Sequence, residues 1–270
     1  MKLEAQWKQE RWKIWSPRAE PVPDSPSLLY KISLCTTCMN RAVDLKRTLI
    51  QNLLDNRHYP HLEFVILNYN SIDDLHEFML SAEIGPYLKS GRVRYIRTSI
   101  PRFYSSSHSH NVAFRNATGQ IVLSLDADNF TGIGFADYVN RLANIRPRKA
   151  MFSRGKRRIH GRIGMYKDEF EALGGYDEDL IGYGYDDRSL MLRAMRAGFT
   201  LMWWTGTTRS SFARRIATPK DDVAINMEYR DWKESERQNR QLTLEKIGRG
   251  EVVANAGRNW GHIDGLEIYQ

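Results

Sequence analysis

The chain has 270 residues, of which 41% are hydrophobic and 27% charged, a composition that excludes wholesale disorder, collagen and coiled-coil arrays. A mean hydropathy of -0.55 and the lack of any apolar run of about 18 residues exclude a membrane-spanning helix. The formal net charge of +8 favours anionic partners such as nucleic acid, anionic lipid, diphosphates or acidic sugars, and charge alone does not choose among them.

Residues 1–30 are predicted to be an extension that precedes the main domain, because four prolines in its second half bar a continuous helix. Before these prolines, Trp7, Trp12 and Trp15 stand among basic side chains, and they either pack on the main domain or contact a membrane surface. The first residues lack the continuous apolar stretch of a secretory signal, and two cysteines are too few for a disulfide scaffold. We therefore expect a cytoplasmic protein, with peripheral membrane contact through the tryptophans as the alternative.

From residue 31 the chain alternates strands and helices. Apolar and β-branched runs predict strands at 31–35, 62–68, 92–98 and 120–128. Apolar residues at helical spacing predict helices at 41–54, 73–84 and 108–117. This alternation predicts an α/β fold with a doubly wound, mostly parallel sheet that carries helices on both faces.

The second half is less regular. Residues 151–167 contain two expected strands around a basic turn, and residues 168–178 a short helix. A helix is predicted at 187–197, a strand at 199–204 and a long, highly charged helix at 221–247. We expect residues 31–270 to form one domain, with one half at 31–130, a second half at 131–220, and a helix and a loop at 221–270.

Two pairs of polar side chains follow strands of the predicted parallel sheet. Asp126 and Asp128 end the strand at 120–128, and Asn68 and Asn70 end the strand at 62–68. In such folds ligands bind beyond the carboxyl ends of the strands. Two carboxylates one residue apart can present oxygens to one hard cation, Mn²⁺ or Mg²⁺, which would bridge to a diphosphate. A solvated turn or a helix cap is the alternative.

A second acidic pair, Asp186 and Asp187, follows a glycine-rich loop and begins a helix. The helix dipole favours ionised carboxylates at this position, and a fixed carboxylate beside a ligand site is a plausible general base. Helix capping alone is the alternative. Gly184 and Tyr185, which directly precede the pair, are expected to line the ligand site beside it.

Ten Lys and Arg residues and no acid lie between Arg141 and Lys167. They form either a solvated basic face or a site that captures an anionic donor or acceptor, with Arg154 and Arg158 at its mouth. The motif Cys35-Thr36-Thr37-Cys38 has no second cysteine pair for a structural zinc site. We expect two buried, unreactive thiols rather than a redox centre.

Five segments of the chain occur in a recognisable order and spacing: ISLCTTCMNRAVDLKRTL, LEFVILNYNSIDD, SHSHNVAFRNATGQIV, IVLSLDADN and GGYDE with GYGYDDRSLMLR. Together, over about residues 31–204, they resemble the inverting nucleotide-sugar glycosyltransferases of family two and its relatives, which have the GT-A fold. The resemblance implies a Rossmann-like half that binds the nucleotide-sugar donor, residues 31–130, fused to an acceptor-binding and catalytic half, residues 131–220.

The resemblance also implies roles for single residues. Those at the donor are Thr37, Arg41, Asn68, Asn70, His110, Asn111 and Asp126. Two of these positions depart from the family pattern: Asn68-Tyr69 stands where two aspartates are usual, and His110 stands where an arginine is usual. Asp128 and Asp126 take the metal positions.

The same resemblance places the catalytic pair at Asp186 and Asp187, with Asp187 as the general base and Arg193 as the arginine that follows. His262, in a C-terminal loop, is the candidate for a third metal ligand. The implied reaction is a single displacement that inverts the anomeric centre.

The expected enzyme is a hexosyltransferase of polysaccharide biosynthesis that moves sugar from a UDP-sugar to a hydroxyl of a glycan or glycolipid, with no nucleic acid involved. Two alternatives are a nucleotidyltransferase and a catalytically silent protein that binds polyanions on the same fold.

Overall fold

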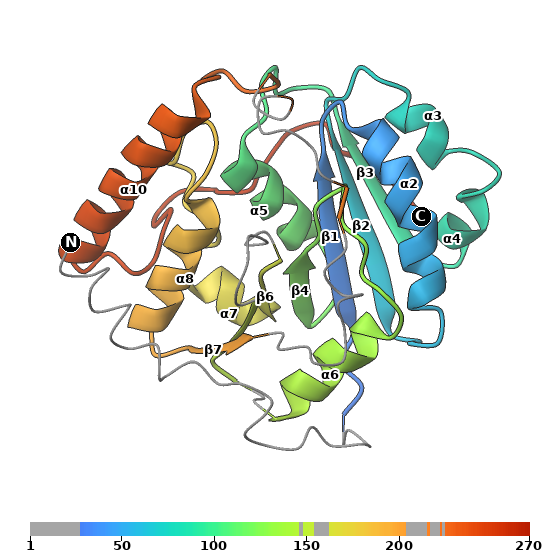
Figure 1. Cartoon of the computed structure of the whole chain (residues 1–270), viewed down its shortest axis with the longest axis horizontal. Coiled ribbons are helices and arrows are strands. Elements are labelled where there is room, and N and C mark those ends of the chain that lie inside the picture. The colour runs from blue at the N-terminus through green and yellow to red at the C-terminus, as the bar shows by residue number, and fades with distance from the viewer. Residues whose placement is uncertain (1–27, 146–147, 154–161, 204–214, 217–221, 223–224) are drawn as a thin grey trace.

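The computed structural model describes residues 28–145, 148–153, 162–203, 215–216, 222 and 225–270 (Figure 1). The predictions for Trp7, Trp12, Trp15, Arg154 and Arg158 lie outside these residues. Within them, one eight-stranded sheet has the order β7-β5-β6-β4-β1-β2-β3-β8.

Four parallel strands form the centre of the sheet, as predicted. They are β1 (Ile32–Cys38), β2 (Leu62–Tyr69), β3 (Val93–Thr98) and β4 (Ile121–Ser124). β1 pairs with β2 and β4, and β2 pairs with β3. Parallel strands are covered on both faces, so their side chains are apolar almost without interruption, and every residue of β2 is buried.

Shorter strands extend this centre on both sides. β6 (Gly164–Tyr166) joins β4 in the antiparallel sense, and β5 (Ala150–Ser153) and β7 (Thr200–Trp203) follow it. At the other edge, β8 (Glu267–Tyr269) runs antiparallel to β3. The sheet is therefore mostly parallel.

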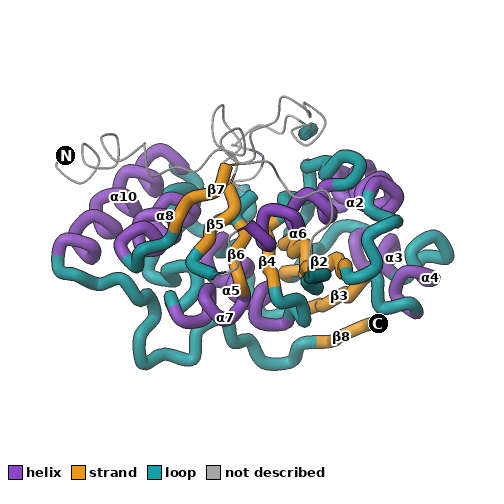
Figure 2. The backbone as a smooth tube through the Cα atoms, turned by 90° about the horizontal axis from the view of Figure 1, so that it is seen from below, coloured by secondary structure: helices purple, strands orange, loops and turns teal. Residues whose placement is uncertain are grey.

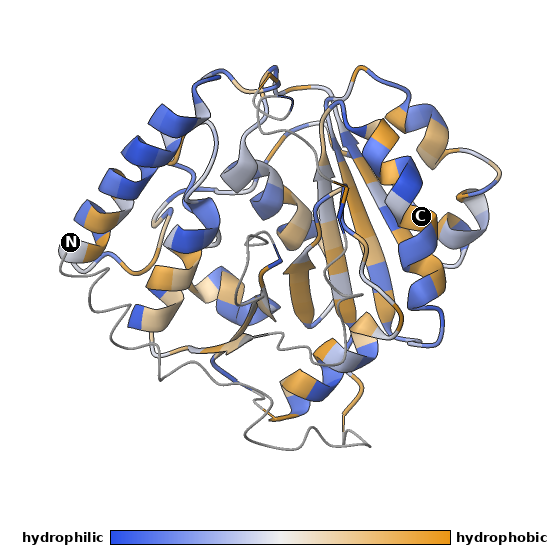
Figure 3. Cartoon of the chain, viewed as in Figure 1, coloured by the Kyte–Doolittle hydropathy of each residue, from blue (hydrophilic) through white to orange (hydrophobic). Residues whose placement is uncertain are grey.

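Helices lie on both faces of the sheet (Figure 2). On one face, α2 (Ala42–Asp55), α3 (Leu75–Met79), α4 (Gly85–Lys89) and α6 (Phe135–Ile145) bury their apolar side chains against the strands. On the other face, α5 (Ser106–Asn116), α7 (Lys167–Ala172) and α8 (Asp186–Arg196) do the same. α10 (Trp232–Gly248) lies beside α8 and is largely hydrophilic (Figure 3).

Alternate residues of each central strand supply the two cores. Phe64 and Ile66 of β2 pack with α2, whereas Val65 and Leu67 pack with α5. This period of two is that of a strand buried on both faces. The described residues contain no helix that is long and apolar enough to cross a membrane.

Three element predictions were wrong. The helix expected at 73–84 is only α3, which ends at Met79, and a second short helix, α4, begins at Gly85 with Pro86 in its first turn, where the N–H that proline lacks would have no helical partner. The strand expected at 120–128 ends at Ser124. The helix expected at 221–247 begins only at Trp232, where the side chain of Asp231 accepts hydrogen bonds from the backbone N–H groups of Lys233 and Glu234.

Candidate active site

The carboxyl ends of the central strands bring the predicted side chains together. Register pairs Cys35 of β1 with Ser124 of β4, and Cys38 of β1 with Asn68 of β2. The Thr36 hydroxyl donates to the carbonyl of Leu125 at 2.7 Å and so holds the start of the turn that follows β4. The Asp126-Ala127-Asp128 turn therefore follows the carboxyl end of β4, beside the end of β1, so both aspartates lie at the end of the fourth strand that the sequence predicted.

One asparagine links the two carboxylates of this turn. The Asn129 side-chain Nδ2 donates to Asp126 Oδ2 at 3.1 Å and to Asp128 Oδ1 at 2.7 Å. Asn129 is 1% exposed, so the link is made in the protein interior. Asp126 is exposed to solvent, yet the protein around its carboxyl is dense enough to raise its pKa by desolvation.

Asp128 is buried beside another acid. Burial, and secondarily the charge of Asp126, raise the pKa of Asp128 to about 6. Arg41 at the start of α2 opposes this rise, with Nη2 3.7 Å from Asp128 Oδ2. Arg215 also opposes it, from a segment that runs alongside the turn, where the Ile216 N–H donates to the Asp128 carbonyl at 2.8 Å.

Asp186 and Asp187 begin α8, as predicted, and each has a hydroxyl partner. Ser106 Oγ donates to Asp186 Oδ2 at 2.5 Å, and the Tyr176 hydroxyl donates to Asp187 Oδ1 at 3.5 Å. Burial raises the pKa of Asp187 well above its ordinary value, and the charges of Asp186 and Asp126 raise it further. The two acidic pairs, distant in sequence, thus act on one another electrostatically.

Three tyrosines that sequence reasoning missed surround these acids. Burial raises the pKa of Tyr183, and so do Asp126, Asp186 and Asp187. Tyr176 is fully buried, and Tyr104 has its pKa raised to about 12 by burial. No sequence pattern identifies these tyrosines as site residues. They lie in the loops before α5 and α8, and folding brings them to the acids.

The predicted donor residues Thr37 and His110 lie beside this cluster. The Thr37 hydroxyl is 2.6 Å from that of Tyr104. His110 donates from Nδ1 to the Ser106 carbonyl at 2.8 Å, and its charge opposes the raised pKa of Asp126. Both side chains therefore belong to the same site as the carboxylates.

The predicted asparagines are instead bonded within the protein. The amide of Asn68 donates to the Tyr95 hydroxyl and accepts from the Ser71 N–H. Asn70, at φ 59°, donates to the Pro101 carbonyl. Asn111 bonds the N–H and the carbonyl of Tyr176, and also the Glu178 carboxylate. In this structure the three amides support the loops of the site.

His262 does not join the acidic turn. Its side chain is exposed, and Nε2 lies 3.1 Å from Asp264 Oδ1. In the part of the chain that the structure describes, no three His, Cys, Asp or Glu side chains are arranged to hold a metal ion. The predicted trio of Asp126, Asp128 and His262 is therefore not assembled here, and only the aspartate pair lies together.

The loop before α8 is held in an unusual conformation. Tyr185 has a φ of 69° and is buried, and a side chain added at Gly184, where φ is 91°, would press on Glu236 of α10. The carbonyl of Gly184 accepts from Asn239 of α10 at 2.8 Å. α10 thus shapes the turn that presents Asp186 and Asp187.

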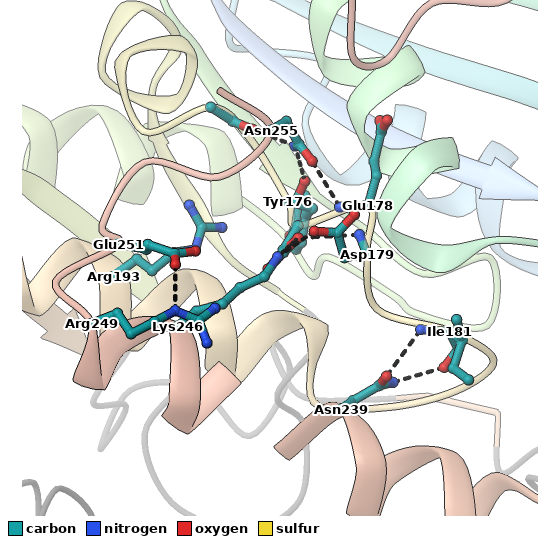
Figure 4. Close-up of polar contacts among 12 residues, drawn as sticks. Tyr176, Glu178, Asp179, Ile181, Arg193, Asn239, Lys246, Arg249, Glu251 and Asn255 are labelled. Atoms are coloured by element: carbon teal, nitrogen blue, oxygen red, sulfur yellow. Dashed lines mark hydrogen bonds and ion pairs between the residues drawn. The ribbon is translucent and has the colours of Figure 1, made fainter. Parts of the chain in front are cut away.

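A network of polar side chains fixes α8 and the loop that carries Tyr176 (Figure 4). Arg193, 2% exposed, donates to the carbonyls of Leu173 and Gly175 at 2.8 and 2.6 Å. Asn255 donates to the Tyr176 carbonyl at 2.7 Å, and Lys246 Nζ lies 2.8 Å from Asp177 Oδ2. The C-terminal segment therefore holds the loop whose tyrosine contacts Asp187.

The two cysteines are free and buried, as expected. Burial raises the pKa of Cys38 to about 12, and the pKa of Cys35 is also raised, first by burial and then by Glu63. Both thiols are therefore protonated and unreactive in the folded chain.

Two sequence models of protein families match this chain. "Glycosyl transferase family 2" matches residues 33–159, and "N-terminal domain of galactosyltransferase" matches residues 147–215. With the mostly parallel sheet described above, these matches support a family 2-like glycosyltransferase of GT-A type. No curated protein matches it.

Solved structures share the fold. A mannosyltransferase from Pyrobaculum calidifontis in complex with GDP-Man and Mn²⁺ is 20% identical, with a TM-score of 0.58 over 92% of this chain and 71% of its own. S. aureus TarS in complex with UDP is 14% identical, with a TM-score of 0.56 over 81% and 72%. GalNAc-T7 with UDP, GalNAc and Mn²⁺ is 16% identical, with a TM-score of 0.52 over 65% and 42%.

Proposed function

We propose that this glycosyltransferase is metal-dependent and inverting, and that it moves a sugar from a nucleoside-diphosphate sugar to a hydroxyl of a glycan or glycolipid. The observation that carries the proposal is the meeting of two acidic pairs. Asp126 raises the pKa of Asp187, so a metal-type turn and a base-type helix start lie close enough to interact electrostatically.

The acidic turn suits a divalent cation. Asp126 and Asp128 offer carboxylate oxygens, the ligands that Mg²⁺ and Mn²⁺ prefer. The raised pKa values of both groups reflect negative charge held close together in a poorly solvated place, which a cation would relieve. These two residues would hold it, and it would supply charge compensation for a departing nucleoside diphosphate. Two of the similar structures, those with GDP-Man and with UDP and GalNAc, carry Mn²⁺.

Asp187 is the general base of the proposal. Its raised pKa increases its affinity for a proton, which a carboxylate needs in order to deprotonate an acceptor hydroxyl. The Tyr176 hydroxyl orients the carboxylate, and Asp186 is held separately by Ser106. Attack by the deprotonated hydroxyl on the face opposite the diphosphate inverts the anomeric carbon.

Thr37, Arg41, His110 and Tyr104 are the proposed donor contacts, because they lie beside the carboxylates. Asn68, Asn70 and Asn111 support this site through the bonds described above. A UDP-sugar remains the proposed donor, and the similar structures hold UDP, UDP-GlcNAc and GDP-Man.

The proposed acceptor site combines Gly184 and Tyr185 with Arg154 and Arg158, whose charge suits an anionic glycan or lipid-linked acceptor. A cytoplasmic location is proposed because two protonated free thiols fit a reducing compartment.

Product analysis tests the proposal against the nucleotidyltransferase alternative. The protein is incubated with Mn²⁺, a panel of nucleotide sugars and a mixed glycan acceptor, and the released nucleotide is identified. Release of a nucleoside diphosphate, with a new glycosidic bond of opposite anomeric configuration, is the expected result. Release of pyrophosphate from nucleoside triphosphates, with no sugar transfer, would reject it.

A further inference from the structure

The side chain of Asn129 contacts three charged groups at once. Its amide NH₂ has two hydrogens, and Nδ2 lies within hydrogen-bond distance of Asp126 Oδ2 and Asp128 Oδ1, at 3.1 and 2.7 Å. Its carbonyl oxygen Oδ1 accepts from Arg162, from Nε at 3.1 Å and from Nη2 at 2.8 Å. Asn129 and Arg162 are each 1% exposed, so water does not compete for the bonds between these two side chains.

The chemistry of the partners fixes which way the amide points. A guanidinium has only donors, so it must face the amide oxygen. An ionised carboxylate has only acceptors, so both must face the amide NH₂. Reversing the amide would set its oxygen against two carboxylates and its NH₂ against a cation. Arg162 therefore imposes the orientation through which Asn129 holds the two aspartates.

The backbone of Asn129 is fixed independently of its side chain. Its carbonyl accepts from the Asn52 side chain of α2 at 2.9 Å, and the residue bridges to Arg215. Arg162 is fixed too, because Nη2 also donates to the Phe130 carbonyl at 2.8 Å. The fixed backbone of Asn129 and the fixed Arg162 side chain therefore hold the Asn129 amide in place beside the two carboxylates.

Asn129 contacts only one oxygen of each aspartate, Oδ2 of Asp126 and Oδ1 of Asp128. Two neighbouring carboxylates repel one another and would rotate apart without a shared donor. We propose that Asn129, oriented by the buried Arg162, is a positioning residue that holds Asp126 and Asp128 together for a divalent cation. This proposal rests on the metal role of these aspartates in the proposed function.

The experiment measures Mn²⁺ affinity directly. Full-length protein is titrated with Mn²⁺ in the presence of UDP, and separately of GDP, and free Mn²⁺ is followed by electron paramagnetic resonance against nucleotide-only blanks. Asn129→Ala should weaken Mn²⁺ binding about tenfold or more, the usual effect of losing a group that orients metal ligands. Asn140→Ala is the matched control, because Asn140 is equally buried but binds the backbone of Leu28 and Tyr30. Its Mn²⁺ affinity should equal that of the wild type.

A folded Asn129→Ala variant, verified by circular dichroism, with wild-type Mn²⁺ affinity overturns the proposal. If this variant does not fold, Arg162→Lys and Arg162→Met replace it. Lysine keeps a donor facing Oδ1 and methionine does not, so Arg162→Met should bind Mn²⁺ several-fold more weakly, and equal affinities overturn the proposal.

Asp128→Asn separates this proposal from the metal role itself. It should abolish Mn²⁺ binding. If Asp128→Asn binds Mn²⁺ as the wild type does, the metal role of the aspartates is rejected. If Asp128→Asn loses Mn²⁺ binding but Asn129→Ala keeps it, only the positioning role of Asn129 is rejected.

Discussion

The metal-free protein should become more stable when Asp128 is replaced by asparagine. The pKa of Asp128 is about 6 in the folded chain against 3.8 for the free side chain, a rise of about two units caused by burial and Asp126. The folded state therefore binds this proton more tightly than the unfolded state does. The stability that the group contributes is full below its unfolded pKa and is lost as pH rises through about 6.

The size of the effect follows from that shift. Two pKa units correspond to about 3 kcal/mol, an upper limit. We expect Asp128→Asn to raise the free energy of unfolding at pH 7.5 by about 1–3 kcal/mol, or Tm by about 2–10 °C for a chain of this size. At pH 4 the gain should vanish, because Asp128 is then protonated.

The assay is thermal unfolding followed by circular dichroism in EDTA at pH 7.5 and pH 4. Asp179→Asn is a control of opposite sign: partial burial raises the pKa of Asp179, but hydrogen bonds from Lys246 and Arg258 lower it overall. That stability is present above the unfolded pKa and lost as pH falls, so Asp179→Asn should lower Tm at pH 7.5. A lower Tm for Asp128→Asn at pH 7.5 would refute the electrostatic reasoning.

Three further outcomes are expected. Lys246→Met should lower the free energy of unfolding, measured by urea denaturation, by about 3 kcal/mol, because the Asp177 side chain is 2% exposed and would lose its counter-ion. Arg249→Met removes an exposed ion pair and should leave the denaturation midpoint unchanged. Asp187→Asn should lower kcat about 10²–10⁴-fold with Mn²⁺ affinity retained, and unchanged kcat would exclude it as the base. A thiol reagent at pH 8 should label Cys35 and Cys38 only on unfolding, and fast labelling of the native chain would contradict their burial.

The sequence predicted the parts of the fold that depend on local pattern. Apolar runs located β1, β2 and β3, and the apolar run of the fourth strand placed Asp126 at the carboxyl end of β4. Three of the described elements were missed: α4, α6 and β8. α6 has apolar residues at helical spacing and could have been found from them, whereas β8 is three residues long and exists only through its pairing with β3.

The contacts between distant segments could not be predicted. The contact of Thr37 with Tyr104 spans 67 residues, and that of Asn255 with Tyr176 spans 79. The resemblance implied a donor role for Asn111, and its bonds to the backbone of Tyr176, 65 residues away, were not predicted. Side-chain partners of this kind depend on packing, which a linear pattern does not encode.

Nucleotide binding with and without Mn²⁺ tests the central claim most directly. UDP, GDP, CDP and dTDP, and their sugars, are each added to the wild type and to Asp128→Asn, and Tm is recorded. A ligand at about a hundredfold excess over its Kd adds about 2.7 kcal/mol of stability. The account predicts a rise in Tm with one nucleotide that requires Mn²⁺ and is lost in Asp128→Asn. A rise that is independent of both Mn²⁺ and Asp128, or no rise with any nucleotide, would contradict it.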